Sequence, residues 1–172
     1  VGGWMPGATS ASHRIDGILG IAALSAHWPL MARPQRYWHW FAWHAVVPVT
    51  TALLDYWPGW AGLKMDLSAT LGREFAAWAK SPGFVFDAPQ FDARGNAEKF
   101  TGKLHLLQID DDPWGTPAAV SALQPYYPNA KRNVMETVRP ADFGLQKIGH
   151  LAFFRSQYRE TLWPLAVARL SA

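Results

Sequence analysis

The sequence predicts an α/β fold built on a mostly parallel sheet. Two apolar runs, at residues 15–25 and at Lys103–Ile109, have the length and continuity of strands buried on both faces. A third strand is expected at Arg132–Val138, where polar and apolar residues alternate as they do nearer the edge of a sheet. A helix between the last two strands completes an order of elements that is typical of an open parallel sheet.

Composition limits the classes of protein to which the chain can belong. Hydrophobic residues make up 49% of the 172 residues and charged residues 17%, which excludes an intrinsically disordered chain and provides for one domain with a substantial core. The net charge is only +3 and the basic residues form no stripe, so no nucleic-acid partner is expected. The chain has no cysteine, which excludes disulfides, thiolate metal sites and a cysteine nucleophile. We expect a cytoplasmic location, which the lack of cysteine permits.

The segment between the first two strands is too long for a plain crossover. Connections of this length usually carry structure of their own. We therefore expect a helical cap inserted at residues 26–102, over one edge of the sheet. Residues 1–25 and 103–172 then form the core domain.

Two helices are expected within the inserted segment. The first, at residues 37–56, is rich in aromatic residues and should be broken at Pro48, because proline has no backbone N–H and clashes with the preceding turn. The second, at residues 67–80, places four large apolar side chains on one side: Leu67, Leu71, Phe75 and Trp78. A loop rich in Pro, Gly and Asp follows at residues 81–96.

Tryptophan is concentrated in the same segment. Six of the ten tryptophans lie close together: Trp28, Trp38, Trp40, Trp43, Trp57 and Trp60. This density exceeds what a core needs and indicates an amphipathic lid or an apolar binding surface. Polar residues and Pro48 interrupt the stretch, so its apolar runs are far shorter than the ~18 residues that a membrane span needs. No membrane span is expected.

Two further helices are expected in the C-terminal part of the chain. One begins with Thr116 as N-cap and Pro117 in the first position, and Val120 and Leu123 share one face. The other follows Gly149 and carries apolar side chains at helical spacing: Leu151, Phe154, Tyr158, Leu162 and Leu165.

Two polar clusters follow strands of the predicted sheet. Asp110, Asp111 and Asp112 come directly after the second strand, and His150 follows the third. Catalytic groups of open α/β sheets gather where strands end at their carboxyl side. We therefore expect a carboxylate to meet the imidazole of His150 above the sheet, where it would hold one tautomer and stabilise the protonated form.

Each of these residues also has an ordinary structural interpretation. Three consecutive aspartates are more often a solvated turn than a catalytic acid, and a lone histidine is more often a satisfied loop residue. The aspartates have the oxygen ligands that Mg²⁺ prefers, but no second carboxylate cluster accompanies them, so neither a metal nor a cofactor is expected. His39 and His44 are five residues apart and lack the spacing of helical metal ligands, so we expect both to pack within the cap.

The residues around the two polar clusters resemble the C-terminal half of an α/β-hydrolase. Residues 111–114 (Asp-Asp-Pro-Trp) and 149–154 (Gly-His-Leu-Ala-Phe-Phe) are similar to the acid loop and the histidine loop of a bacterial group of predicted α/β-hydrolases. Residues 2–7 and 13–16 resemble the part of that family that follows its nucleophile elbow. The resemblance covers essentially the whole chain and is looser in the expected cap.

The resemblance implies a serine hydrolase that acts on an ester or related acyl bond through a Ser-Asp-His triad. His150 would be the general base, and Asp112 would be the acid that orients it, since the family's acid directly precedes the proline of this loop. Asp111 is the alternative acid. The family's serine stands in a Gly-x-Ser-x-Gly turn. With Gly2 as the closing glycine of that turn and Val1 as the residue before it, the serine comes immediately before Val1. The backbone N–H of Val1 would then donate to the oxyanion.

The resemblance also implies what the chain works with. The chain is expected to be the C-terminal part of the enzyme, and its first partner is the N-terminal half of the same hydrolase. The aromatic cap favours a small-molecule, ester-like substrate with an apolar portion. The alternative is a non-catalytic small-molecule-binding protein on the same fold, since a fold does not determine its function. A serine before Val1 would favour the enzyme.

Overall fold

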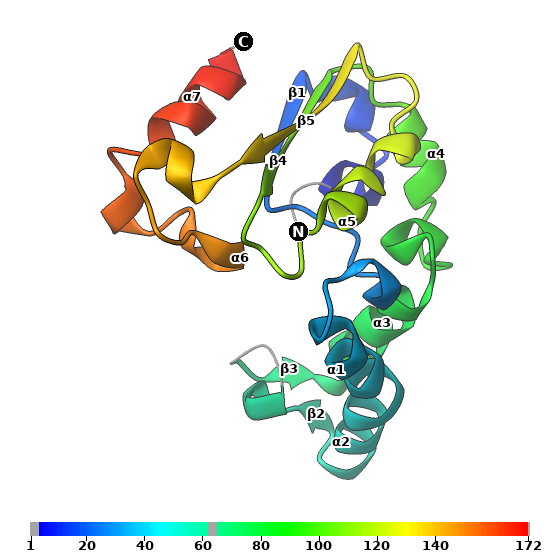
Figure 1. Ribbon diagram of the computed structural model, residues 1–172. Coiled ribbons are helices and arrows are strands. Elements are labelled where there is room, and N and C mark those ends of the chain that lie inside the picture. Colours follow the sequence, from blue (N-terminus) through cyan, green and yellow to red (C-terminus); the bar gives the residue numbers. More distant parts are fainter. Residues whose placement is uncertain (1–3, 62–64, 172) are drawn as a thin grey trace.

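The computed structural model describes residues 4–61 and 65–171 (Figure 1). These residues form a mixed α/β structure that contains a three-stranded parallel sheet and a separate two-stranded antiparallel sheet. In Figure 1 the parallel sheet lies in the upper part. Helices α1 (Gln35–Phe41), α2 (Val47–Leu53) and α3 (Ala69–Lys80) extend away from it below, together with the small sheet.

The parallel sheet has the order β1-β4-β5. Strand β4 (Lys103–Ile109) is central and pairs with both β1 (Gly17–Ile21) and β5 (Arg132–Val138). The register aligns Lys103 with Gly17 on one side and with Arg132 on the other. The predicted bounds of β4 and β5 are confirmed, as is their parallel direction.

Strand β1 is shorter than the apolar run that predicted it. The prediction of a strand over residues 15–25, buried on both faces, was wrong: β1 ends at Ile21, and its residues are mostly half-exposed because it is an edge strand among the described residues. The backbone leaves the strand at Ala22, whose φ is 49°. Residues 22–26 are buried as a connection, and the N–H of Ser25 donates to the carbonyl of Ala119 at 2.8 Å. Burial of this connection explains the length of the apolar run.

Side chains on the two faces of β4 fill two separate cores. Leu104 and Leu106 belong to the core formed with α4 (Ala93–Glu98), α5 (Pro117–Ser121) and the turn at Phe84–Asp87. Leu107 and Ile109 belong to the core on the other face, which includes residues of the C-terminal segment. All four side chains are fully buried, as expected for the central strand.

The predicted start of α5 is confirmed. The side chain of Thr116 accepts the N–H of Ala119 at 3.2 Å, and Pro117 is the first helical residue. Val120 and Leu123 are fully buried, so the predicted face is the one that packs on the sheet.

The aromatic helix is continuous through Pro48. Helix α1 (Gln35–Phe41) passes through a π-helical turn (Ala42–Val46) into α2 (Val47–Leu53). The prediction of a break at Pro48 was wrong, because the chain widens just before the proline instead. Pro48 has no N–H to offer the preceding turn, and a π-helical turn is one way in which a helix absorbs such a missing hydrogen bond.

The second helix of this segment packs through small residues. Helix α3 (Ala69–Lys80) begins after Ser68, whose hydroxyl accepts the N–H of Leu71. The prediction of the buried face of this helix was wrong in part, since Leu71 is 42% exposed. The buried positions are Ala69, Gly72, Ala76 and Ala79. Strands β2 (Tyr56–Trp57) and β3 (Leu67–Ser68) pair beside α3 and are too short to be recognised from the sequence.

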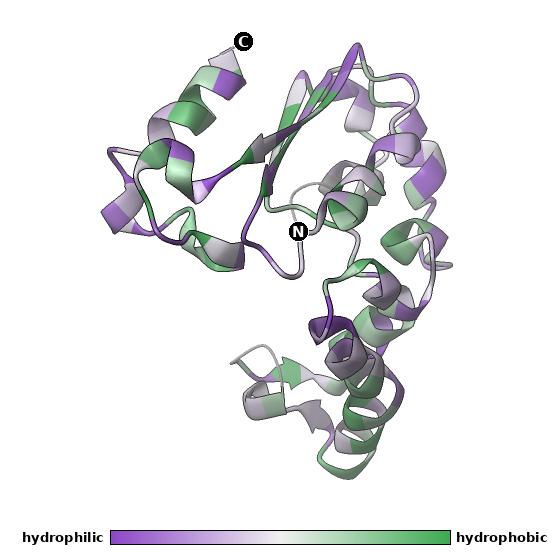
Figure 2. Ribbon diagram, in the orientation of Figure 1, coloured by the Kyte–Doolittle hydropathy of each residue, from purple (hydrophilic) through white to green (hydrophobic). Residues whose placement is uncertain are grey.

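The inserted segment leaves much apolar surface uncovered. Figure 2 shows hydrophobic residues gathered along α2 and α3. Several large apolar side chains on α1, on α2 and in the 3₁₀ turn at Gly59–Ala61 are exposed: Tyr37, Trp38, Trp40, Phe41, Val49, Leu53 and Trp60. No helix in the described part of the chain is both long enough and apolar enough to cross a membrane.

The C-terminal segment consists of three short helical pieces, so the prediction of one long helix was wrong. The pieces are α6 (Gly149–Ala152), a 3₁₀ turn (Ser156–Tyr158) and α7 (Trp163–Ser171). Leu151 and Phe154 are exposed, whereas Phe153 and Leu162 are buried together in one core. The polar residues between Phe153 and Leu162 turn the chain back on itself, so the helical spacing of the apolar residues was coincidental.

An ion-pair network holds α7 against the sheet. The guanidinium of Arg169 donates to both carboxylate oxygens of Glu136 on β5, at 2.7 and 2.9 Å. His105 on β4 lies 3.1 Å from the same carboxylate. The hydrogen bonds from Arg169 lower the pKa of Glu136 below its ordinary value of 4.5.

We expect acid to loosen α7. Because the pKa of Glu136 is lower in the folded protein, its stabilising effect is complete above the ordinary value and is lost as the pH falls through the folded value. Hydrogen-exchange protection of the α7 amides should therefore decrease between about pH 5 and pH 3, the range over which a paired carboxylate becomes protonated. In Glu136→Gln that decrease should disappear, and an unchanged decrease would contradict the assignment.

Truncation of a buried side chain on the central strand β4 should strongly destabilise the protein. Leu106→Ala removes a fully buried side chain and should lower the free energy of unfolding by about 2–5 kcal/mol. Leu53→Ala, at a position that is 78% exposed, is the matched control and should change it by about 0.5 kcal/mol or less. Urea denaturation followed by tryptophan fluorescence measures both changes, and equal losses would argue against the described core.

Candidate active site

The three aspartates follow β4 in a tight turn. The N–H of Asp110 donates to the carbonyl of Val138, which continues the pairing of β4 with β5. The N–H of Asp112 donates back to the carbonyl of Ile109 at 3.1 Å and closes the turn. As a result Asp110 is exposed, whereas Asp112 is directed inward and is only 3% exposed.

Two residues that sequence reasoning missed hold this turn in shape. Gln108 is fully buried, and its Nε2 donates to the carbonyls of Ile109 and Gly115, at 2.7 and 3.0 Å. Those bonds join the two ends of the turn. A Cβ atom at Gly115 would lie 2.4 Å from Oδ2 of Asp112, so only glycine leaves room for the carboxylate. A polar residue inside a buried strand was the signal that could have found Gln108.

Asp111 fixes the start of the histidine loop. Its two carboxylate oxygens accept the backbone N–H groups of Ile148 and Gly149, at 2.9 and 2.8 Å. Gly149 has a φ of 67°, a left-handed conformation that favours glycine. These contacts determine where α6 begins, and His150 is its second residue.

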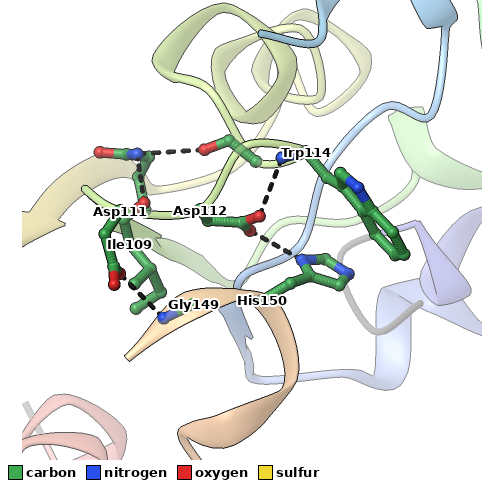
Figure 3. Close-up of polar contacts among 8 residues, drawn as sticks. Ile109, Asp111, Asp112, Trp114, Gly149 and His150 are labelled. Atoms are coloured by element: carbon green, nitrogen blue, oxygen red, sulfur yellow. Dashed lines mark hydrogen bonds and ion pairs between the residues drawn. The ribbon is translucent and has the colours of Figure 1, made fainter. Parts of the chain in front are cut away.

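Asp112 and His150 form a hydrogen-bonded pair (Figure 3). Nδ1 of His150 donates to Oδ2 of Asp112 at 2.7 Å, and the N–H of Trp114 donates to Oδ1 at 2.9 Å. The side chain of Asp112 is fully buried, and that of His150 is 22% exposed. The predicted contact is thus confirmed. Asp111, the alternative acid, binds backbone N–H groups instead of the imidazole.

This pair has the geometry of a general base with its orienting acid. A carboxylate can only accept at Nδ1, so the proton of a neutral His150 lies on Nδ1 and leaves a basic lone pair on Nε2. Among the residues that the structure describes, none forms a hydrogen bond with Nε2. Val1, the predicted oxyanion donor, lies outside the described residues. The catalytic roles of Asp112, His150 and Val1 stay predictions.

Aromatic rings pack beside the pair. The indole of Trp114 lies 4.8 Å from the imidazole of His150, centroid to centroid. On α1, the ring of His39 meets the same indole nearly edge-on, at 5.4 Å and 84°. His39 is buried, and burial lowers its pKa, so this imidazole is neutral at pH 7. His44 is exposed and stacks on Trp40.

Neighbouring carboxylates do not combine into a metal site. In residues 4–61 and 65–171, no group of three or more His, Asp or Glu is arranged to hold a metal ion. The reason is visible in the turn, since Asp110 faces solvent, Asp111 binds two backbone N–H groups and Asp112 binds an imidazole. Three adjacent aspartates thus have three different environments.

Comparison with known proteins adds no family assignment. No family model and no curated protein matches the chain. The function is therefore inferred from the residues and their geometry.

Adjacent aspartates should differ sharply on substitution. Asp111→Ala leaves two backbone N–H groups of the histidine loop without their charged acceptor and should cost about 1.5–3 kcal/mol of unfolding free energy. Asp110→Ala removes an exposed carboxylate and should cost about 0.5 kcal/mol or less. Chemical denaturation of both variants measures the difference. Similar losses would mean that Asp111 does not anchor the loop.

Proposed function

We propose that the protein is a serine hydrolase of the α/β-hydrolase fold that cleaves an ester or related acyl bond. The observation that carries the proposal is the hydrogen bond of 2.7 Å from Nδ1 of His150 to the fully buried carboxylate of Asp112. A buried carboxylate that binds one nitrogen of an imidazole, so that the other nitrogen can act as a base, is the arrangement used to activate a hydroxyl nucleophile.

In this proposal each residue has a defined role. Nε2 of His150 accepts the hydroxyl proton of the serine while the serine oxygen attacks the acyl carbon of the substrate. The imidazolium that results then protonates the leaving group. Asp112 holds the tautomer and stabilises the imidazolium. His150 next activates a water, which releases the acid from the acyl-serine. The serine is the residue immediately before Val1, and the N–H of Val1 donates to the oxyanion.

The topology supports the hydrolase fold and the cap. Strands β1 and β4 are far apart in the sequence yet lie side by side, which is what an insertion between two core strands produces. The first part of the segment between them has a core of its own, which includes Trp43, Val47 and Trp57. Its later part, with the turn at Phe84–Asp87 and helix α4, packs in the core of the sheet. We assign residues 1–25 and 103–172 to the hydrolase core and residues 26–102 to the insertion, whose aromatic first part is the proposed cap.

Aromatic surface near the pair supports an apolar portion in the substrate. The indole of Trp114 is in contact with His150, and α1, which contributes His39 to that indole, carries the exposed rings of Trp38 and Trp40. A substrate whose acyl group reacts near Nε2 of His150 would lie close to the indole of Trp114. A small-molecule, ester-like compound is therefore the proposed substrate class.

A fluorophosphonate probe tests the proposal. The full-length protein should be labelled on the serine that precedes Val1. His150→Gln should abolish labelling, because its amide can still donate to Asp112 but has no basic nitrogen. Asp112→Asn should slow turnover by about 10⁴-fold, the cost of the same change in a known triad.

Asp110→Asn is the matched control, since Asp110 is exposed and outside the pair, and it should be labelled like the wild type. If His150→Gln is still labelled, His150 is not the general base. A residue other than serine before Val1, together with binding of ester-like compounds without turnover, would favour a non-catalytic binding protein.

A further inference from the structure

We propose that Trp114 is a positioning residue for His150, and that its indole links the Asp112–His150 pair to helix α1 through His39. The role of Trp114 in turnover rests on the proposed function. Its effect on the orientation of the His150 imidazole does not depend on that function and can be measured separately.

Trp114 contacts both members of the pair. Its backbone N–H donates to Oδ1 of Asp112 at 2.9 Å, the oxygen that His150 does not use. Its indole lies 4.8 Å from the imidazole at an angle of 50° (Figure 3). One residue therefore fixes the carboxylate through its backbone and the imidazole through its side chain.

The imidazole needs this second contact. The hydrogen bond at Nδ1 orients the ring while it is formed. Whenever that bond breaks, the ring can rotate, since the terminal torsion of histidine is broad. The indole restricts that rotation and covers one side of the pair. Exclusion of water also strengthens the bond between Asp112 and His150, because a hydrogen bond is stronger in a medium of low dielectric constant.

The indole also contacts the aromatic segment. The ring of His39 meets Trp114 at 5.4 Å, and Nδ1 of His39 donates to the carbonyl of Gln35 at 2.8 Å, which fixes that ring on α1. His39 in turn packs on Trp43 at 5.9 Å. A row of rings thus runs from His150 through Trp114 and His39 to Trp43.

Two hydrogen bonds also join the acid loop to the segment that leads into α1. The N–H of Ala32, just before α1, donates to the carbonyl of Pro113 at 3.0 Å. The hydroxyl of Thr116 donates to the carbonyl of Leu30 at 2.5 Å. A displacement of α1 would therefore act on the loop that carries Asp112 and on the ring that covers His150.

Exchange of the Nδ1 proton of His150 with water, followed by NMR, tests the inference in the full-length protein. Trp114→Ala should accelerate this exchange by about 2- to 12-fold, the factor that corresponds to the loss of one aromatic pair. Trp114→Phe retains a ring and should restore the wild-type rate. Trp60→Ala, at a tryptophan that is 79% exposed, is the matched control and should leave the rate unchanged.

The link to α1 is tested by a second pair of variants. His39→Ala removes the ring that packs edge-on against the indole and should also accelerate exchange, whereas His39→Phe should not. This pair decides the question if Trp114→Ala does not fold. Exchange in both alanine variants equal to that of Trp60→Ala would overturn the inference.

A kinetic readout separates this inference from the proposed function. If the enzyme is labelled by the fluorophosphonate, Trp114→Ala should slow labelling by the same factor and Trp114→Phe should restore it. If wild type is not labelled, the hydrolase proposal fails, and the exchange rates still decide the positioning role of Trp114.

Discussion

The burial of one carboxylate constrains the rest of the site. A charged group with no access to water is stable only when hydrogen bonds and an opposite charge or dipole replace the solvent. Asp112 obtains these from His150 and from the N–H of Trp114, and the absence of a side chain at Gly115 leaves the space that its oxygens occupy. The acid loop and the histidine loop must therefore come together for either to be stable.

The parallel sheet makes that meeting possible, and the neighbouring aspartate completes it. Strands β4 and β5 end on the same side, so the segments that follow them start close together. Asp111 then binds the backbone of the histidine loop, while the next residue binds its side chain. The division of roles follows from the tight turn after Ile109, which directs consecutive side chains to different surroundings.

Local chemistry made part of this predictable from the sequence. Strands β4 and β5, the N-cap at Thr116 and the meeting of a carboxylate with His150 follow from periodicity, capping and strand direction. The choice of Asp112 over Asp111 came from the resemblance to the hydrolase family. Burial caused by distant parts of the chain was not predictable. Residues 22–26 are apolar because they are covered as a connection, and Phe153 and Leu162 are buried because the chain turns back between them.

The same distinction explains why the role of Trp114 was not predicted. Its place in the acid loop is visible in the sequence, but the ring of His39 that packs against it comes from α1, which is far away along the chain. Burial lowers the pKa of His39, which favours the neutral form of the ring at this contact. The aromatic segment therefore does more than cover the sheet, since one of its buried side chains supports the residue that orients His150.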